Sequence, residues 1–187
     1  GQAAFIDGCD LVVRFNQCTS YGQGGVRTDV VALCNTGRPA KAMLYSAHWR
    51  SHAAVKSAGE IWSVRESGKF ESMRVDVLAR HPELDDFFED FTAEFADFAR
   101  QQGKSHSVVA RSVHEAVDEQ LAELTSEPYV CPSSGLVTLR HVLDTVRKPS
   151  DDVFIAGFGH QGWEGHPFSA EKQLIERWIA KGDLARL

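Results

Sequence analysis

The feature that most constrains the fold is a short apolar run, Val153-Phe-Ile-Ala-Gly157, which leads into a glycine-rich loop and then a helix over 169–181. A continuous apolar run bounded by turn residues is typical of a buried strand. A buried strand followed by a helix is the repeating unit of α/β folds, in which parallel strands lie beneath covering helices. This segment therefore predicts an α/β protein.

Other segments continue the alternation of strands and helices. Strands are predicted over 10–15, 29–34, 40–45 and 60–65, with a glycine-rich loop over 16–28. Helices are predicted over 82–100, 107–124 and 136–146. The sequence thus predicts a mostly parallel, Rossmann-like sheet flanked by helices. We expect a single α/β domain over 1–187, in which 82–125 forms a helical insertion or lid.

Composition excludes several classes of protein. Hydrophobic residues make up 43% of the 187 residues and charged residues 25%, which is the balance of a folded globular chain. No apolar run approaches the ~18 residues of a membrane-spanning helix. A net charge of −6 disfavours nucleic acid and anionic lipid as main partners. The four cysteines show neither a C-x-x-C pair nor zinc-site spacing, which favours a reducing, cytoplasmic location.

Candidate ligand-binding residues lie where helices begin and strands end. Ser133, Ser134 and Gly135 precede the helix predicted over 136–146, where free backbone N–H groups and the helix dipole can bind an anion. The alternative is that the serines only cap that helix. Asn16 ends the first strand, where its amide can face a ligand or close a local Asx turn.

Candidate catalytic residues lie in the loop that follows the buried strand. His160 and His166 can exchange protons near neutral pH, and Glu171 is placed to hydrogen-bond an imidazole. Both histidines could instead be polar loop residues or structural imidazoles. A metal site formed by His160, Glu164 and His166 is a further alternative, although the helical H-E-x-x-H spacing is absent.

In chain order, these segments resemble motifs of the animal-type sialyltransferase family and its bacterial relatives. Ile6-Asp7-x-x-Asp10-Leu-Val-Val-Arg-Phe-Asn16, with the glycine-rich stretch to Thr28, resembles the second half of that family's large motif. Pro132-Ser-Ser-Gly135 and 152–159 resemble its small motif, and His166-Pro-Phe-Ser-Ala-Glu171 resembles its very small motif. The resemblance covers residues 5–35 and 129–187.

The resemblance implies a variant GT-A-like fold and an inverting, metal-independent glycosyltransferase. Such an enzyme would move an acidic sugar, sialic acid or a Kdo-like sugar, from a CMP-sugar donor to a glycan hydroxyl. The implied catalytic residues are the general base His166, with Glu171 and His160. The implied nucleotide-binding residues are Asn16, Ser133, Ser134 and Gly135. No cofactor is expected beyond the CMP-sugar substrate, and the expected partners are this donor and a glycan acceptor.

Two departures from the family pattern leave other functions open. The family's first strand and its Gly-Asn turn would lie before Gly1, so the first strand-helix unit is expected to be missing. The cysteine of the small-motif helix is absent from 136–144, which fits a cytosolic bacterial-type member. The alternatives are a catalytically degenerate nucleotide-binding or scaffold protein of the same fold, and a metal-dependent hydrolase that uses His160, Glu164 and His166.

Overall fold

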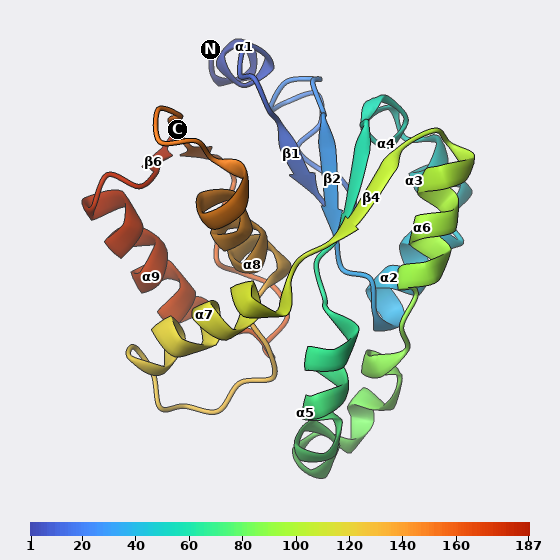
Figure 1. Cartoon of the computed structure of the whole chain (residues 1–187), viewed down its shortest axis with the longest axis vertical. Coiled ribbons are helices and arrows are strands. Elements are labelled where there is room, and N and C mark those ends of the chain that lie inside the picture. Colours follow the sequence, from blue (N-terminus) through green and yellow to red (C-terminus); the bar gives the residue numbers. More distant parts are fainter. The chain divides into compact units, whose positions relative to one another are not determined.

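A computed structural model describes all residues from 1 to 187, which form two compact units (Figure 1). Unit 1 is Gly1–Val109 and unit 2 is Ala110–Leu187. No helix is both long and apolar enough to cross a bilayer. All four cysteines are free thiols. The expectation that 1–187 is one domain with a helical insertion over 82–125 stays a prediction.

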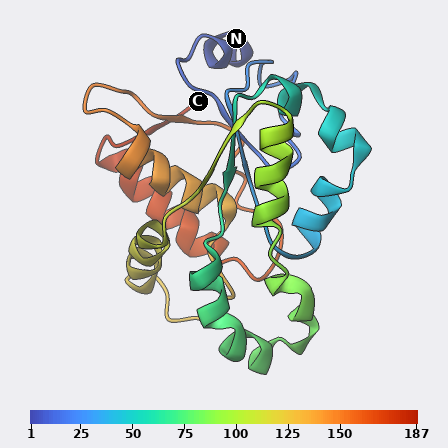
Figure 2. The same ribbon diagram turned by 45° about the vertical axis from the view of Figure 1, so that its right-hand side comes forward.

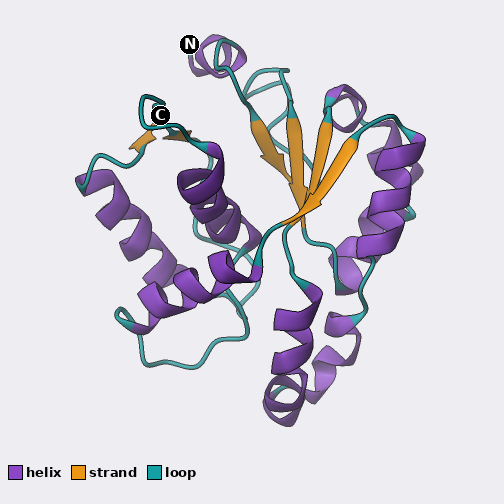
Figure 3. Cartoon of the chain, viewed as in Figure 1, coloured by secondary structure: helices purple, strands orange, loops and turns teal.

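Unit 1 is built on a four-stranded parallel sheet, in the order β1-β2-β3-β4 (Figure 3). The strands are β1 (Val13–Phe15), β2 (Val30–Leu33), β3 (Glu60–Ser63) and β4 (Ser105–Val108). Every residue of β2 is buried, as expected of an inner strand of a parallel sheet. The predicted α/β class with a mostly parallel sheet flanked by helices is confirmed, and β4 is a strand that the sequence analysis missed.

Four helices supply the core that covers one face of this sheet. They are α2 (Gly37–Leu44), α3 (Ala47–Ser51), α4 (Ala53–Ser57) and α6 (Thr92–Gln101). Val31, Leu33 and Ile61 alternate along β2 and β3, and they share one hydrophobic cluster with Trp49 and Phe95 from the helices. Helix α6 packs along β3 and β4 (Figure 2).

The predicted strand over 40–45 is wrong, because this segment belongs to α2. Ala40, Met43 and Leu44 are buried at the three- and four-residue steps of a helix, and alanine, lysine, methionine and leucine all favour helix. The chain enters α2 through Gly37, whose φ of 66° lies in the left-handed region. A Cβ at this position would lie 3.2 Å from backbone atoms of Asp86 and Phe87, which only glycine avoids.

The single helix predicted over 82–100 is divided in two. A 3-10 helix, η1 (Pro82–Phe88), comes first, and Thr36 and Asp90 then form an isolated bridge before α6 begins. Asp90 accepts hydrogen bonds from the backbone N and the Oγ1 of Thr92 at the start of α6. The remaining helices of unit 1 are α1 (Gln2–Asp7) and α5 (Ser67–Arg80), neither of which was predicted.

Unit 2 contains three helices packed around one core. They are α7 (Arg111–Ala122), α8 (Ser134–His141), which continues into a π-helical turn η2 (Val142–Val146), and α9 (Phe168–Ala180). Two short parallel strands, β5 (Phe154–Ile155) and β6 (Ala185–Arg186), pair with each other. The predicted helices over 136–146 and 169–181 are confirmed, whereas the helix predicted over 107–124 begins only at Arg111 because β4 takes its first residues. The strand predicted over 153–157 is shorter than expected, and its Phe154 is exposed.

Candidate functional site

The carboxylate of Glu171 is buried at the N-terminus of α8. Glu171 lies in the first turn of α9 and is 2% exposed. Its Oε1 accepts a hydrogen bond from the backbone N of Ser133, and its Oε2 accepts one from Ser133 Oγ, both at 2.6 Å. Ser133 Oγ also accepts from the backbone N of Leu136, so Ser133 is the N-cap of α8. The backbone N–H and the hydroxyl of Ser133, which the family resemblance assigned to nucleotide binding, thus donate to the carboxylate of Glu171.

Burial raises the pKa of Glu171. The two hydrogen bonds from Ser133 favour the carboxylate and lower the pKa, but they do not cancel the effect of burial. At this position the balance between carboxylate and neutral acid is therefore shifted toward the neutral acid, compared with a glutamate in water.

The imidazole of His166 is oriented by the backbone. Its Nδ1 lies 2.8 Å from the carbonyl oxygen of Cys131, and because a carbonyl only accepts, Nδ1 carries the proton. Nε2 is then the ring's acceptor atom. The ring is half-buried and lies edge-on to Trp163 and Phe168, with centroids 5.0 and 5.4 Å away. The carbonyl of Cys131 thus orients the ring, and the Glu171 carboxylate accepts its hydrogen bonds from Ser133.

The loop between β5 and α9 packs closely against the segment before α8. The carbonyl oxygen of Gly165 accepts hydrogen bonds from the backbone N of Val130 and of Cys131, at 2.9 and 3.3 Å. The ring of Trp163 lies so close to Gly165 that a Cβ at position 165 would overlap it. The absence of a side chain at Gly165 therefore leaves room for the ring of Trp163, which is 39% exposed.

His160 lies in the same loop with a left-handed backbone conformation, at a φ of 48°. Its Nε2 is buried without a hydrogen-bond partner. Burial lowers the pKa of His160, and the positive charges of Arg186 and Lys172 lower it further. The structure therefore favours a neutral His160 at pH 7.

Ser134 and Gly135 form the first turn of α8 and are both partly exposed. The ring of Phe158 covers Gly135, and a Cβ at position 135 would lie 3.2 Å from its Cε1. Within unit 2 the structure thus joins Ser133 to Glu171 by hydrogen bonds and places His166 against Cys131, two residues before Ser133.

Asn16 follows β1 in unit 1 and makes hydrogen bonds to neighbouring backbone and side-chain atoms. Its Oδ1 accepts from the backbone N of Cys34 at 2.8 Å, and its carbonyl oxygen accepts from Trp49 Nε1 at 2.8 Å. Its φ of 46° is left-handed, a conformation that asparagine adopts more readily than most residues. Asn16 thus links the ends of β1 and β2, and its convergence with the candidate residues of unit 2 stays a prediction.

Replacing Asn16 with alanine is expected to destabilise unit 1 by about 2 kcal/mol, since Cys34 N loses its acceptor and alanine disfavours this backbone conformation. Asn16→Gly also lacks the acceptor, but glycine tolerates the left-handed conformation, so this variant should lose less stability. Hydrogen exchange at the β1 and β2 amides measures both losses. Equal protection in Asn16→Ala and the unaltered protein would refute this structural role.

The glycine-rich loop after β1 is organised around Arg14, which is 4% exposed. Its guanidinium donates to the carbonyl oxygens of Gly24, Gly25 and Arg27, and to the hydroxyls of Ser20 and Thr28, at 2.8 to 3.1 Å. Nη2 donates to the carbonyls of Gly24 and Gly25, and the single N–H of Nε is shared between the Arg27 carbonyl and Thr28 Oγ1. The loop thus folds around a buried cation.

The metal-site alternative is not formed in the structure. No group of three or more histidine, cysteine, aspartate or glutamate side chains within 1–187 is placed to hold a metal ion. His160, Glu164 and His166 therefore do not make a three-ligand site.

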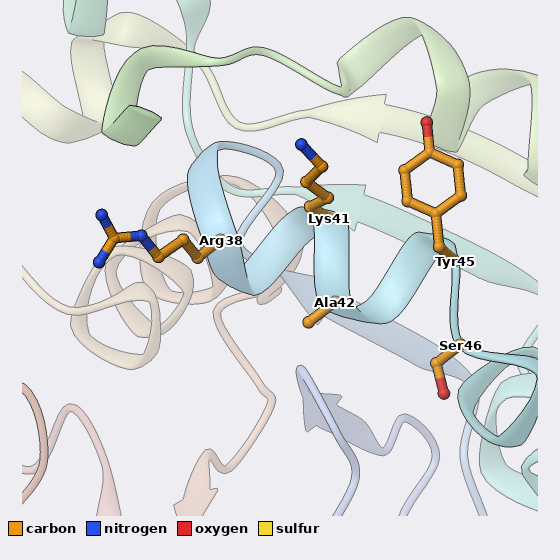
Figure 4. A pocket seen from close by; sticks show the side chains of 5 residues that line it. All are labelled: Arg38, Lys41, Ala42, Tyr45 and Ser46. Carbon is orange, nitrogen blue, oxygen red and sulfur yellow. The ribbon is translucent and has the colours of Figure 1, made fainter. Parts of the chain in front are cut away.

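A surface on α2 was missed by the sequence analysis. Arg38, Lys41, Ala42, Tyr45 and Ser46 line a shallow depression of about 510 Å³ (Figure 4). The charge pattern of residues 30–59 could have indicated it, because lysine and arginine occur there without acidic residues.

Comparison with known proteins identifies a relative of the whole chain. No family model matches the sequence, and no solved structure matches it. The chain is 48% identical over its 187 residues to the urease operon 23 kDa accessory protein of Rhizobium meliloti (strain 1021). The alignment covers 100% of this chain and 87% of the relative. The chain belongs to the family of this urease operon accessory protein.

Membership of this accessory family corrects the functional predictions made from the sequence. The resemblance to sialyltransferases is misleading, and the predicted glycosyltransferase activity, CMP-sugar donor and glycan acceptor are wrong, because the full-length relative is a urease operon accessory protein. The resemblance rested on short motifs, of which the residue pair His166 and Glu171 is the least specific. The finer assignment of the sheet to a GT-A-like fold rested on the same resemblance and has no other support.

Proposed function

We propose that this chain assists the maturation of urease as an assembly factor that binds urease proteins and does not transfer sugars. The observation that carries the proposal is the 48% identity over the whole chain to a urease operon accessory protein. A binding role is closest to the scaffold alternative considered from the sequence. The proposed location is the cytoplasm, which the four free thiols support.

The candidate contact residues of unit 2 in this proposal are His160, His166 and Ser134. All three are partly exposed, and the carbonyl of Cys131 orients the ring of His166. The hydrogen bonds between Ser133 and Glu171 join the start of α8 to the first turn of α9. No cofactor is proposed.

The proposal is tested in a Rhizobium meliloti strain from which the gene for the 23 kDa accessory protein has been deleted. We expect urease activity in extracts of this strain to fall, and expression of this chain to restore it. Immunoblotting would check that the chain accumulates to the level of the native protein. Unchanged urease activity after the deletion, or no recovery with equal amounts of folded chain, would contradict the proposal.

A further inference from the structure

The strand β4 forms one edge of the sheet in unit 1. It is the last strand in the order β1-β2-β3-β4, so β3 is the only strand with which it pairs (Figure 3). The backbone N atoms of Ser105 and Val109 donate to carbonyl oxygens at the two ends of β3, both at 3.0 Å. Since alternate residues of a strand bond to opposite neighbours, the backbone N–H and C=O groups of His106 and Val108 point away from β3.

These outward backbone groups of His106 and Val108 have no partner within residues 1–187. They lie at the protein surface, since Ser105 is exposed and Val108 is 39% exposed. A row of free N–H and C=O groups along a strand is matched by another extended backbone, which presents acceptors and donors at the same spacing. The occupant that fits this edge is therefore an extended polypeptide strand.

The sequence of β4 lacks the features that keep the edges of natural sheets from pairing. Such edges carry lysine, proline or a bulge, whereas Ser105-His-Ser-Val108 has neither residue and pairs with β3 in an uninterrupted register. Lys104, the residue before the strand, is directed elsewhere, because its Nζ donates to carbonyl oxygens at the end of α4. The opposite edge differs, since the carbonyl oxygen of Phe15 in β1 accepts from the backbone N of Cys18. The edge open for pairing is therefore that of β4.

The strand is also neutral, which allows two copies of the chain to meet there. Copies of a chain with a net charge of −6 repel one another, but β4 contains no aspartate, glutamate, lysine or arginine. Its one histidine, His106, lies on the face of the sheet that α6 covers, with Nε2 2.9 Å from Ser63 Oγ. Burial lowers the pKa of His106 more than the charge of Glu60 raises it, so the ring is neutral at pH 7.

We propose that β4 pairs in antiparallel orientation with β4 of a second copy of this chain, about a twofold axis that passes between the two Ser107 residues. His106 of each copy then lies opposite Val108 of the other, and each of these pairs exchanges both of its N–H···O bonds. This register pairs every outward backbone group of the strand. On the face that α6 covers, the exposed Val108 side chain packs beside the His106 ring of the other copy.

A second copy fits this edge better than an unrelated segment, because the outward pattern of β4 is its own complement. Twofold dimers that use the same patch on both subunits are the commonest soluble oligomers. The strand has only four residues, and its pairing buries less than the about 1,200 Å² of a stable interface, so we expect a dissociation constant on the order of micromolar or higher. The pairing does not depend on the urease role proposed above.

The first test measures dimerisation of the full chain by sedimentation equilibrium over a concentration series. Val108→Pro removes an outward N–H but no bond to β3, and Val108→Lys places a charge on the edge. Val75→Lys makes the same change at a valine of α5 that is 79% exposed. We expect both Val108 variants to raise the dissociation constant at least about 10-fold and Val75→Lys to leave it within about twofold. Circular dichroism would verify that each variant is folded.

The second test examines the register by cross-linking. Ser107→Cys and Ser105→Cys are each made in a Cys9→Ser chain, since Cys9 is the one thiol that is not buried, and are treated with the thiol oxidant diamide. The two Ser107 positions form a non-hydrogen-bonded pair with Cα atoms about 4.5 Å apart, within reach of a disulfide. Position 105 lies opposite position 109 of the other copy. We therefore expect a disulfide-linked dimer from Ser107→Cys and none from Ser105→Cys.

Three outcomes would overturn the inference. The first is that the unaltered chain stays monomeric up to its highest soluble concentration. The second is a dimer that Val108→Pro and Val108→Lys leave unchanged, or that cross-links through position 105 and not through 107. The third is that the chain is monomeric while Val108→Pro abolishes its binding to urease, since the occupant would then be a strand of the partner. That third result would leave the proposed function standing.

Discussion

Replacing Glu171 with alanine is expected to destabilise unit 2 by about 3 kcal/mol, because the backbone N and the hydroxyl of Ser133 lose their acceptors in a buried position. The substitution also leaves a cavity between α8 and α9. Since a chain with two compact units need not unfold in one step, hydrogen exchange at the α8 amides is the appropriate measurement. Protection factors within threefold of those in the unaltered protein would show that this carboxylate is not structural.

Glu171→Gln provides the matched comparison and a test of pH dependence. Glutamine reproduces the neutral acid, since its amide oxygen can accept from Ser133 N and its amide nitrogen can donate to Ser133 Oγ. We expect this variant to be at least as stable as the unaltered protein at pH 7, in contrast to Glu171→Ala.

The sign of the pH effect follows from the raised pKa of Glu171. Between the ordinary pKa of glutamate and the raised value, the folded state holds more protons than the unfolded state, so stability falls as pH rises through this window. Glu171→Gln lacks this titration and should lack the corresponding fall. Parallel stability–pH curves for the two proteins would contradict the raised pKa.

Replacing Arg14 with methionine is expected to destabilise unit 1 by on the order of 3 kcal/mol, because several acceptors of the glycine-rich loop lose a charged donor together. Arg14→Lys keeps the charge but not the planar fork, and it should recover only a small part of this loss. The loss is measured by hydrogen exchange at the β1 and β2 amides. The control is Arg27→Met, which removes an arginine from the same loop that is more exposed and paired with Asp29. An effect of Arg14→Met no larger than that of the control would show that the loop does not depend on the buried cation.

The sequence predicted the secondary structure best in segments with one clear hydrophobic pattern. The alternation of apolar strands with helices correctly indicated a parallel α/β sheet, whereas the helix predicted over 82–100 is confirmed as an α-helix only in its second half, where α6 lies. The apolar content of 40–45 predicts a strand, but its alanine, lysine, methionine and leucine residues favour the helix that forms. The strand β4 was missed because its polar sequence, Ser105-His-Ser-Val108, indicates neither the pairing with β3 nor the packing against α6.

The sequence does not reveal the hydrogen bonds that the predicted site residues make within the protein. It predicts that Ser133 binds a nucleotide or caps a helix, and that Glu171 hydrogen-bonds an imidazole. The contact between these two residues is seen only in the coordinates, since it spans 38 residues of sequence. The same limit applies to Asn16, whose amide oxygen bonds the backbone N of Cys34.

The different burial of the four thiols has a consequence for chemical labelling. Cys18, Cys34 and Cys131 are buried, whereas Cys9 at the end of α1 is partly exposed. Burial also raises the pKa of Cys18 to about 11, which keeps that sulfur protonated and unreactive at neutral pH. A maleimide dye added to the folded protein therefore reacts at Cys9 first. The native sequence thus offers an attachment point for a fluorophore, on which the approach of a partner protein can be followed without engineered cysteines.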